Sequence, residues 1–271
     1  MRLGFHSIHF SPVFGGNAPL SDVVAGAAAA GFRYIGLDLP AIDAEVASGG
    51  SVETIAGLLA VHDLSCTDLV VLAITADDDA ALADARRIAA IADVVGAGLC
   101  VVAVPDPMAW PRIVDSTRRS ADVLWDHGVR LAVEFTPYIA LSTLHQATDL
   151  CDAVGWDRAG LLLDSLHFFR GATSWDELHA LDGAQIALLQ ISDAAGAPPE
   201  NLMDESRHGR LLPGAGDLPL AAFAAAIAAT GFDGPLTAEV LSADLRRRHP
   251  ETVAQLVRES LVALWPEADA K

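Results

Sequence analysis

Basic residues are scarce in this chain of 271 residues. Lysine and arginine together number 17 against 36 acidic residues, which gives a formal net charge of −19. A field of that sign repels a phosphate backbone, so nucleic acid is excluded as an expected partner. The single basic run, Arg246-Arg247-Arg248-His249, is too short for a nucleic-acid surface and is interpreted as a solvated loop before the last helix.

Long apolar runs and paired cysteines are also missing. No uninterrupted apolar stretch reaches the roughly 20 residues that span a bilayer, although 52% of the residues are hydrophobic. Residues 1–6 lack the apolar core of a signal peptide. Cys66, Cys100 and Cys151 lie far apart without a Cys-x-x-Cys pair, and buried, reduced thiols are expected. These absences predict a cytoplasmic protein without a membrane partner.

Short apolar runs alternate with alanine-rich segments throughout the chain. Near-continuous apolar runs are typical of parallel strands covered by helices. Eight such units in about 250 residues predict one (β/α)8 TIM barrel over residues 1–271. A doubly wound open sheet is the alternative, but Gly15-Gly16-Asn17 after the first strand matches neither nucleotide-binding fingerprint. The expected strands cover residues 3–6, 34–38, 65–72, 99–104, 130–134, 160–164, 186–191 and 235–240.

The segments between these strands have the composition of helices. Ser21 and Asp22 are expected to cap the first helix, and Gly31 to end it. Residues 193–218 show no periodicity, and long connections of this kind often act as lids or binding loops. We therefore expect a structureless functional loop after the seventh strand. The expected helices cover residues 22–30, 79–95, 116–127, 143–154, 220–230 and 250–264.

Polar side chains close four consecutive strands, at Glu134, Asp164, Gln190 and Glu239. Residues at the carboxyl ends of barrel strands point into the mouth where ligands bind. Three carboxylates converging there would repel one another unless a cation lies between them. An all-oxygen set suits a hard cation, so the four residues predict a site for Mg²⁺ or Mn²⁺ rather than Zn²⁺. Four unrelated polar residues at strand ends are the less favoured interpretation.

Residues 130–245 resemble the xylose-isomerase-like TIM-barrel superfamily of sugar epimerases, ketose isomerases and related lyases. Its epimerase branch usually carries histidine where this chain has Gln190. The 3-dehydroshikimate dehydratase branch is similar to this chain there, with Gln-x-x-Asp, and shares the Leu-Pro-Gly-x-Gly-Asp-Leu-Pro loop. The motifs are Val133-Glu134, Leu163-Asp164-Ser165-Leu166-His167, Gln190-Ile191-Ser192-Asp193, Arg210-Leu211-Leu212-Pro213-Gly214-x-Gly216-Asp217 and Ala238-Glu239-Val240.

The resemblance implies a divalent-metal-dependent isomerase or epimerase of a sugar-like polyhydroxy ketone. It implies α-proton abstraction and a metal-stabilised enediolate, with Mn²⁺ or Mg²⁺, or else Co²⁺, as the cofactor. Glu134 and Glu239 are the expected ligands that also act as bases, and His167 the expected proton shuttle or hydrogen-bond donor. The expected substrate contacts are His6, His208 and Arg210.

Two other functions, and the roles of several other residues, are left open by the sequence. A dehydratase of the 3-dehydroshikimate type and a non-catalytic ligand-binding barrel are the alternatives, whereas an endonuclease-like member would need a histidine-rich cluster and a basic groove. Asp38 and Asp68 are expected to bind hydroxyls or cap helices, and His9 to be a loop residue. Homo-oligomers are common in the resembled family, but no feature of this sequence fixes the oligomeric state.

Overall fold

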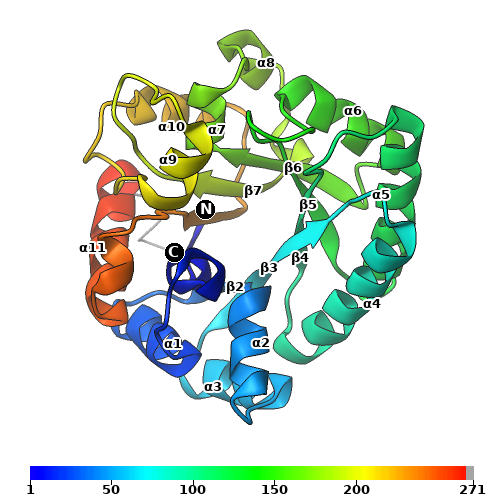
Figure 1. Cartoon of the computed structure of the whole chain (residues 1–271). Coiled ribbons are helices and arrows are strands. Elements are labelled where there is room, and N and C mark those ends of the chain that lie inside the picture. Colours follow the sequence, from blue (N-terminus) through cyan, green and yellow to red (C-terminus); the bar gives the residue numbers. More distant parts are fainter. Residues whose placement is uncertain (267–271) are drawn as a thin grey trace.

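Eight parallel strands close into a barrel surrounded by helices (Figure 1). The structure is a computed structural model and describes residues 1–266. Each strand pairs with the next along the chain, and β8 pairs with β1 to close the ring. The strands are β1 (Arg2–His6), β2 (Tyr34–Asp38), β3 (Ser65–Ala73), β4 (Leu99–Ala103), β5 (Arg130–Glu134), β6 (Ala159–Asp164), β7 (Ile186–Ile191) and β8 (Pro235–Ala238). The predicted TIM barrel is confirmed.

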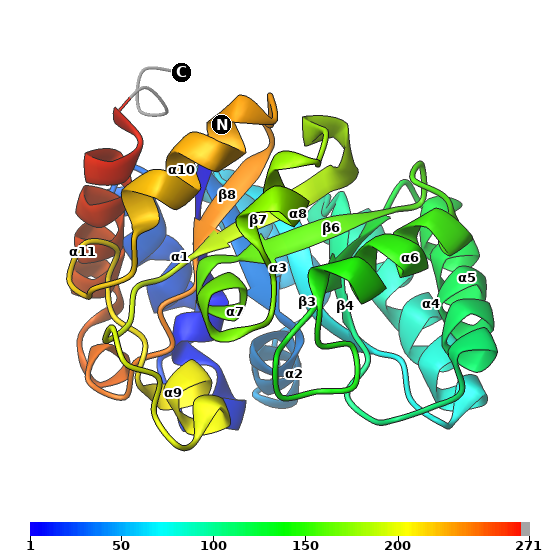
Figure 2. The same ribbon diagram turned by 90° about the horizontal axis from the view of Figure 1, so that it is seen from above.

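The helices form an outer ring, and several short ones gather at the carboxyl ends of the strands. In Figure 2, α7 and α9 lie at the opposite end of the barrel from the amino terminus. The α-helices are α1 (Leu20–Ala29), α2 (Leu39–Ala47), α3 (Val52–Val61), α4 (Asp78–Val95), α5 (Trp110–Trp125), α6 (Leu144–Val154), α7 (Ser165–Arg170), α8 (Trp175–His179), α9 (Leu202–His208), α10 (Leu220–Ala229) and α11 (Pro250–Leu264). The 3₁₀ helices are η1 (Ser7–Phe10), η2 (Pro12–Phe14), η3 (Gly183–Gln185) and η4 (Leu245–Arg247).

Alternation along the strands sorts side chains between two hydrophobic cores. On β5, Leu131 and Val133 join the large core beneath the helices, whereas Ala132 joins a smaller core inside the barrel. The same alternation places Leu162 of β6 inside. Because successive residues of a strand point to opposite faces, Glu134 shares the inner side with Ala132, and Asp164 shares it with Leu162. The fold thus directs both carboxylates into the barrel mouth.

The buried side chains of His6 and Asp68 leave no room for a side chain at position 36, which is a glycine. A Cβ on this residue would lie 2.3 Å from Cδ2 of His6 and 2.7 Å from Oδ1 of Asp68. Both side chains are fully buried, and Nε2 of His6 lies 3.0 Å from Oδ2 of Asp68. Any larger residue on β2 would therefore displace a buried hydrogen-bonded pair.

Several sequence-based boundaries were wrong. The connection after β7 is not structureless, because it contains α9. Helix α1 begins at Leu20 after Pro19 without a side-chain cap, so Ser21 and Asp22 lie within its first turn. Helices α2, α3, α7 and α8 were not expected, and α5 begins at Trp110, six residues earlier than predicted.

The three cysteines are buried and unpaired, as predicted. Of the described helices, none combines the length and the apolar composition that crossing a membrane requires.

Candidate active site

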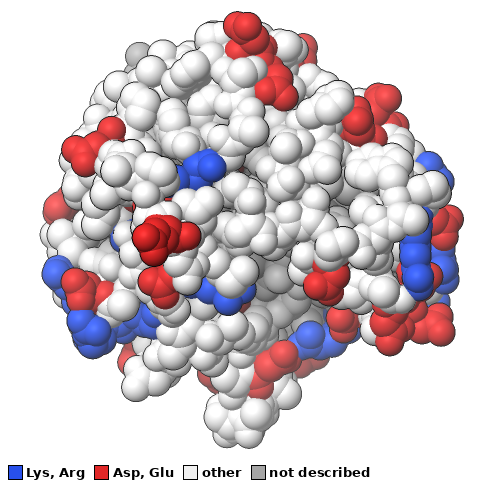
Figure 3. Space-filling model, turned by 45° about the horizontal axis from the view of Figure 1, so that its top comes forward, with Lys and Arg blue, Asp and Glu red and all other residues white. Residues whose placement is uncertain are grey.

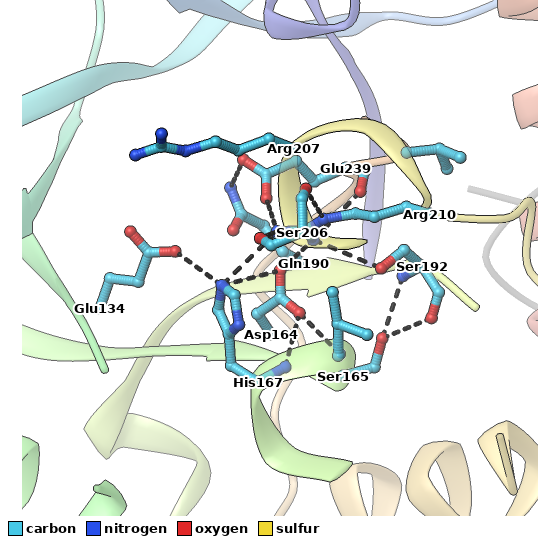
Figure 4. A network of polar contacts seen from close by, with 12 residues as sticks. Glu134, Asp164, Ser165, His167, Gln190, Ser192, Ser206, Arg207, Arg210 and Glu239 are labelled. Carbon is cyan, nitrogen blue, oxygen red and sulfur yellow. Dashed lines mark hydrogen bonds and ion pairs between the residues drawn. The ribbon is translucent and has the colours of Figure 1, made fainter. Parts of the chain in front are cut away.

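The four polar residues predicted at strand ends lie together at the mouth of the barrel (Figure 4). Glu134, Asp164 and Gln190 belong to β5, β6 and β7, and Glu239 follows the last residue of β8. Asp164, Gln190 and Glu239 are almost wholly buried, whereas the side chain of Glu134 keeps 17% of its surface exposed. The cluster therefore combines three desolvated groups with one that is accessible from solvent.

Arg210 is the cation that lies between the buried carboxylates. Its Nη1 is 2.6 Å from Oδ2 of Asp164, and its Nη2 is 2.9 Å from Oε2 of Glu239. The guanidinium is only 2% exposed, although arginine side chains are mostly exposed in proteins. Within residues 1–266, no three His, Cys, Asp or Glu side chains already form a metal cage. Arg210 supplies the countercharge that the sequence analysis assigned to a metal alone.

The two carboxylates respond to this environment in opposite ways. Burial alone would raise the pKa of Asp164, but the neighbouring Arg210 and His167 hold it below its ordinary value. Burial raises the pKa of Glu239 to about 7, and Asp164 and Glu134 add to this rise while Arg210 opposes it. Glu239 therefore exchanges its proton near neutral pH, as a catalytic acid or base does.

His167 lies one turn into α7, where Asp164 holds the helix start. Oδ1 of Asp164 accepts hydrogen bonds from the backbone N–H groups of Leu166 and His167, at 2.7 and 3.2 Å. This N-cap explains the Asp-x-x-His spacing, because it fixes His167 beside the carboxylate. Nε2 of His167 lies 3.4 Å from Oε1 of Glu134 and 3.5 Å from Nη2 of Arg210. The imidazole thus connects the accessible glutamate to the buried charges.

Gln190 leaves a buried acceptor unused. Its Nε2 donates to Oε1 of Glu239 at 3.5 Å, while its Oε1 is buried and has no hydrogen-bond partner. An orphaned amide oxygen is costly unless a donor or a cation satisfies it. Together with the carboxylates of Glu134, Asp164 and Glu239, this oxygen gives an all-oxygen donor set. The residues present therefore fit a hard divalent cation.

The segment after β7 forms a cover whose contacts orient Arg210. Ser206 of α9 accepts hydrogen bonds from Nε of Arg210 through its backbone oxygen, at 2.8 Å, and from Nη2 through its Oγ, at 3.0 Å. Tyr138, from the loop after β5, donates its hydroxyl to the same Oγ at 2.6 Å. Burial raises the pKa of Tyr138 to about 12, so its hydroxyl remains a donor. These contacts close one side of the mouth.

A buried ion pair fastens α9 to α7. Nε of Arg170 donates to Oε2 of Glu205 at 2.8 Å, and Nη2 donates to Oε1 at 2.7 Å. Both side chains are more than nine-tenths buried. Sequence reasoning did not find Arg170, Glu205, Ser206 or Tyr138 as site residues. For Arg170 the available signal was its spacing of three residues from His167, since this places both on one face of α7.

Asp193 explains the glycine-rich part of the same segment. Its carboxylate accepts hydrogen bonds from the backbone N–H groups of Gly214, Gly216 and Leu218, each at 3.0 Å. A Cβ at Gly216 would lie 2.4 Å from Oδ1 of Asp193. The Gln-x-x-Asp and Pro-Gly-x-Gly-Asp motifs thus belong to one structural unit, and Asp193 serves as its anchor.

The remaining predicted histidines lie outside the carboxylate cluster. His6 is fully buried, with Nδ1 accepting from the N–H of Ile8 and Nε2 facing Asp68, so both ring nitrogens are engaged. His208 is partly buried at the end of α9, where its Nδ1 lies 3.4 Å from Nη1 of Arg246. Neither ring contacts the four strand-end residues in the described part of the chain, and their substrate contacts stay predictions.

His9 lies in the 3₁₀ helix η1 and is not the loop residue that was expected. It is buried in η1, its Nδ1 donates to the backbone oxygen of His6 at 2.7 Å, and its Nε2 accepts from the N–H of Val240 at 3.2 Å. Burial lowers the pKa of His9 to about 3, so the ring stays neutral. His9 therefore connects the end of the first strand to the residue after Glu239.

Asp38 is the N-cap of α2, and helix capping was one of the two roles predicted for it.

Comparisons with known proteins agree with this architecture. The profile of the xylose isomerase-like TIM barrel family matches residues 24–263, and the chain belongs to that family. It is 30% identical to the inosose isomerase of Bacillus velezensis over 146 residues, covering 53% of this chain and 51% of that protein. The 3-dehydroshikimate dehydratase of Pseudomonas aeruginosa is 30% identical over 150 residues, covering 55% of this chain and 24% of that enzyme.

The solved structure of the IOLI protein with a bound zinc atom has the same fold. It superimposes with a TM-score of 0.88 over 99% of both chains, at 22% sequence identity. The chain spans about half the length of the inosose isomerases it matches and about a quarter of the dehydratase. The family and the fold are therefore established, and the reaction has to be argued from the site.

Proposed function

We propose that the protein is a divalent-metal-dependent isomerase or epimerase of a sugar-like polyhydroxy ketone. The observation that carries this proposal is the group of Glu134, Asp164, Gln190 and Glu239 at four adjacent strand ends, with an unpartnered amide oxygen among them. Relatives with matching segments include an inosose isomerase. These four residues would hold the metal, with Mn²⁺, Mg²⁺ or Co²⁺ as candidates alongside the zinc of the IOLI structure.

When bound, a divalent cation acts as a Lewis acid that polarises the substrate carbonyl and stabilises developing negative charge. Glu239 is suited to take a carbon-bound proton, because it is a carboxylate at the barrel mouth beside the other candidate ligands. Glu134 and Glu239 both face the mouth, so two carboxylates could serve two faces of a flat intermediate. This arrangement supports return of the proton to the other face or to a neighbouring carbon.

His167 and Arg210 have supporting roles in this proposal. His167 can pass a proton between Glu134 and a substrate oxygen, because its Nε2 lies beside that carboxylate. Arg210 favours the ionised forms of Asp164 and Glu239, and its contact with Ser206 is shared by Tyr138. Its charge also favours an oxyanion that develops nearby.

A dehydratase is the second candidate, and Gln190 favours it. The 3-dehydroshikimate dehydratase branch carries glutamine at this place, and a dehydratase is among the relatives. The first step is the same, since a carboxylate removes a carbon-bound proton. The outcomes then differ, because expulsion of a β-hydroxyl gives a lyase and reprotonation gives an isomerase.

Solvent deuterium incorporation tests both candidates. Mn²⁺-loaded protein is incubated in D₂O with ketoses, inososes and 3-dehydroshikimate, and Glu239→Gln serves as the isosteric control. Metal-dependent exchange without loss of water, abolished in the control, is the expected result. Loss of water with a new conjugated absorbance would indicate the lyase. A protein that binds no divalent metal and catalyses neither process would contradict the proposal and favour a non-catalytic barrel.

A further inference from the structure

A second cavity lies at the carboxyl end of the strands, on the side formed by β2 and β3. Its volume is about 280 Å³, and it is bounded by η2, α2, β3 and α4. Val13, Phe14 and Val71 provide apolar walls, and Val13 is 67% exposed. The four candidate ligands all come from β5 to β8 and do not line this cavity. The mouth therefore has a polar half and a largely apolar half.

Phe14 is a wall shared by the cavity and the active-site cover. Its ring meets the ring of His208 edge to face, with centroids 6.5 Å apart. His208 ends α9, two residues before the Arg210 that joins Asp164 to Glu239. Ile8 and Val70, which line the cavity, belong to the same inner core as Ala132 and Leu162, two residues before Glu134 and Asp164. Figure 3 shows a hollow near the middle of the molecule, with charged side chains of both signs at parts of its edge.

The charges around the cavity disfavour an anion. Three aspartates line it, at positions 38, 43 and 84, against a single cation, Arg87. Arg87 is already paired with Asp43. Arg246 stacks on Phe14, but it donates to the backbone oxygen of Arg207 and so neutralises the end of α9. A carboxylate or phosphate placed here would meet net negative charge without a free cation among the lining residues.

We propose that this cavity receives the part of the substrate remote from its metal-binding hydroxy ketone, and that this part is uncharged. The inference rests on the proposed function and narrows it, since a neutral polyhydroxy ketone is selected over one bearing a carboxylate or a phosphate. The apolar walls take a ring face or carbon chain, while the aspartates disfavour a negative substituent. The net charge of −19 adds to this selection at the encounter stage.

The test uses two ligands that differ in charge and by one methyl group, and that do not turn over because they lack a ketone. Shikimate and methyl shikimate share the same ring hydroxyls, and only shikimate carries a carboxylate. Their dissociation constants are measured by calorimetry with the full chain, with and without Mn²⁺. Val13→Lys adds a cation to the cavity wall at an exposed position, and Val13→Met is the uncharged control of similar length.

We expect the wild-type protein to bind the ester at least fivefold more tightly than the acid. Val13→Lys should shift this ratio toward the acid by about tenfold, the effect of one charge in a partly solvated contact, while Val13→Met should change it less than about twofold. Tighter binding of the acid by the wild type, a ratio that Val13→Lys leaves unchanged, or no binding of the ester would each overturn the inference. Because no ligand reacts, these outcomes are distinct from an absence of deuterium exchange, which would refute the proposed function.

Discussion

Replacement of Arg210 by methionine tests whether this guanidinium is the internal countercharge of the site. The substitution keeps an unbranched apolar stem but removes the guanidinium with its contacts of 2.6 Å to Asp164 and 2.9 Å to Glu239. All three groups are buried, and removing one partner of a buried ion pair costs about 3–5 kcal/mol. We therefore expect Arg210→Met to lower the free energy of unfolding by about 4 kcal/mol at pH 8.

The loss of unfolding free energy in Arg210→Met should depend on pH, and the direction of this dependence follows from the pKa values of Glu239 and Asp164. The folded pKa of Glu239 lies above its unfolded value, so its ionisation destabilises the fold progressively as the pH rises from about 4.5 to 7. The folded pKa of Asp164 lies below its unfolded value, so its ionised form stabilises the fold throughout that range. Without Arg210 both pKa values rise, and at pH 5 Glu239 is protonated. The loss should therefore shrink to about 2 kcal/mol at pH 5.

Urea unfolding of metal-free protein at the two pH values measures this difference. Arg210→Met leaves the carboxylate of Glu239 buried without its ion-pair partner. The double variant Arg210→Met with Glu239→Gln removes that carboxylate, and its free energy of unfolding should be about 2 kcal/mol higher than that of Arg210→Met at pH 8. Arg210→Lys retains the charge without the two-pronged geometry and should lie between wild type and Arg210→Met. Equal losses at both pH values, with no recovery in the double variant, would mean that Arg210 stabilises the protein through packing alone.

Three further outcomes follow from the same contacts. Binding of Mn²⁺ should release a proton from Glu239, because the pKa of this carboxyl group is about 7 in the metal-free protein. Calorimetry in buffers of different ionisation enthalpy should therefore detect more proton release at pH 6 than at pH 8. Equal release at the two pH values would exclude Glu239 as a ligand. Glu205→Gln should break the ion pair with Arg170, lower the free energy of unfolding by about 2 kcal/mol and raise KM more than it lowers kcat. Glu200→Gln, on the exposed loop, is the control. Unchanged kinetics in Glu205→Gln would mean that α9 does not contribute to substrate binding. Gly36→Ala should lower the free energy of unfolding by about 2–3 kcal/mol, because its Cβ would lie 2.3 Å from Cδ2 of His6. The control is Gly57→Ala, at an uncrowded helical position, which should not be destabilising.

The strand framework was predictable because the strands are short apolar runs, and β5 to β8 each end at or near a polar residue. Strands β2, β5 and β7 agree with the predicted residues, and the rest differ by one or two residues at an end. Glu134, Asp164 and Gln190 were placed correctly because a parallel barrel aligns all its carboxyl strand ends. Helices α2 and α9 were missed for a local reason. Their short sequences begin at Leu39-Pro40 and Leu202, and they lack a long periodic apolar stripe.

Long-range polar pairing was beyond the sequence signals. Arg210 is 46 residues from Asp164 and 29 from the backbone oxygen of Glu239 that it contacts, and these separations carry no periodicity. The same holds for Arg170 and Glu205, and for His9, whose partner Val240 is 231 residues away. Closure of the ring between β1 and β8 creates the contact of His9, and the pairing of β6 with β7 brings together the segments that carry the other two pairs. The roles of these residues follow from topology rather than from neighbouring sequence.

The charge balance of the cluster links Arg210, Glu239 and the metal. Glu134, Asp164 and Glu239 face one guanidinium, so the fully ionised group has an excess of two negative charges. Burial is the main cause of the raised pKa of Glu239, and this excess of negative charge adds to it, because taking up one proton removes half of the excess. A divalent cation would remove all of it, and the unpartnered oxygen of Gln190 would supply a neutral ligand. On this argument Arg210 and the metal are not alternatives. Arg210 makes a cluster of three carboxylates stable enough to fold, and the charge that it leaves uncompensated equals the charge of the ion.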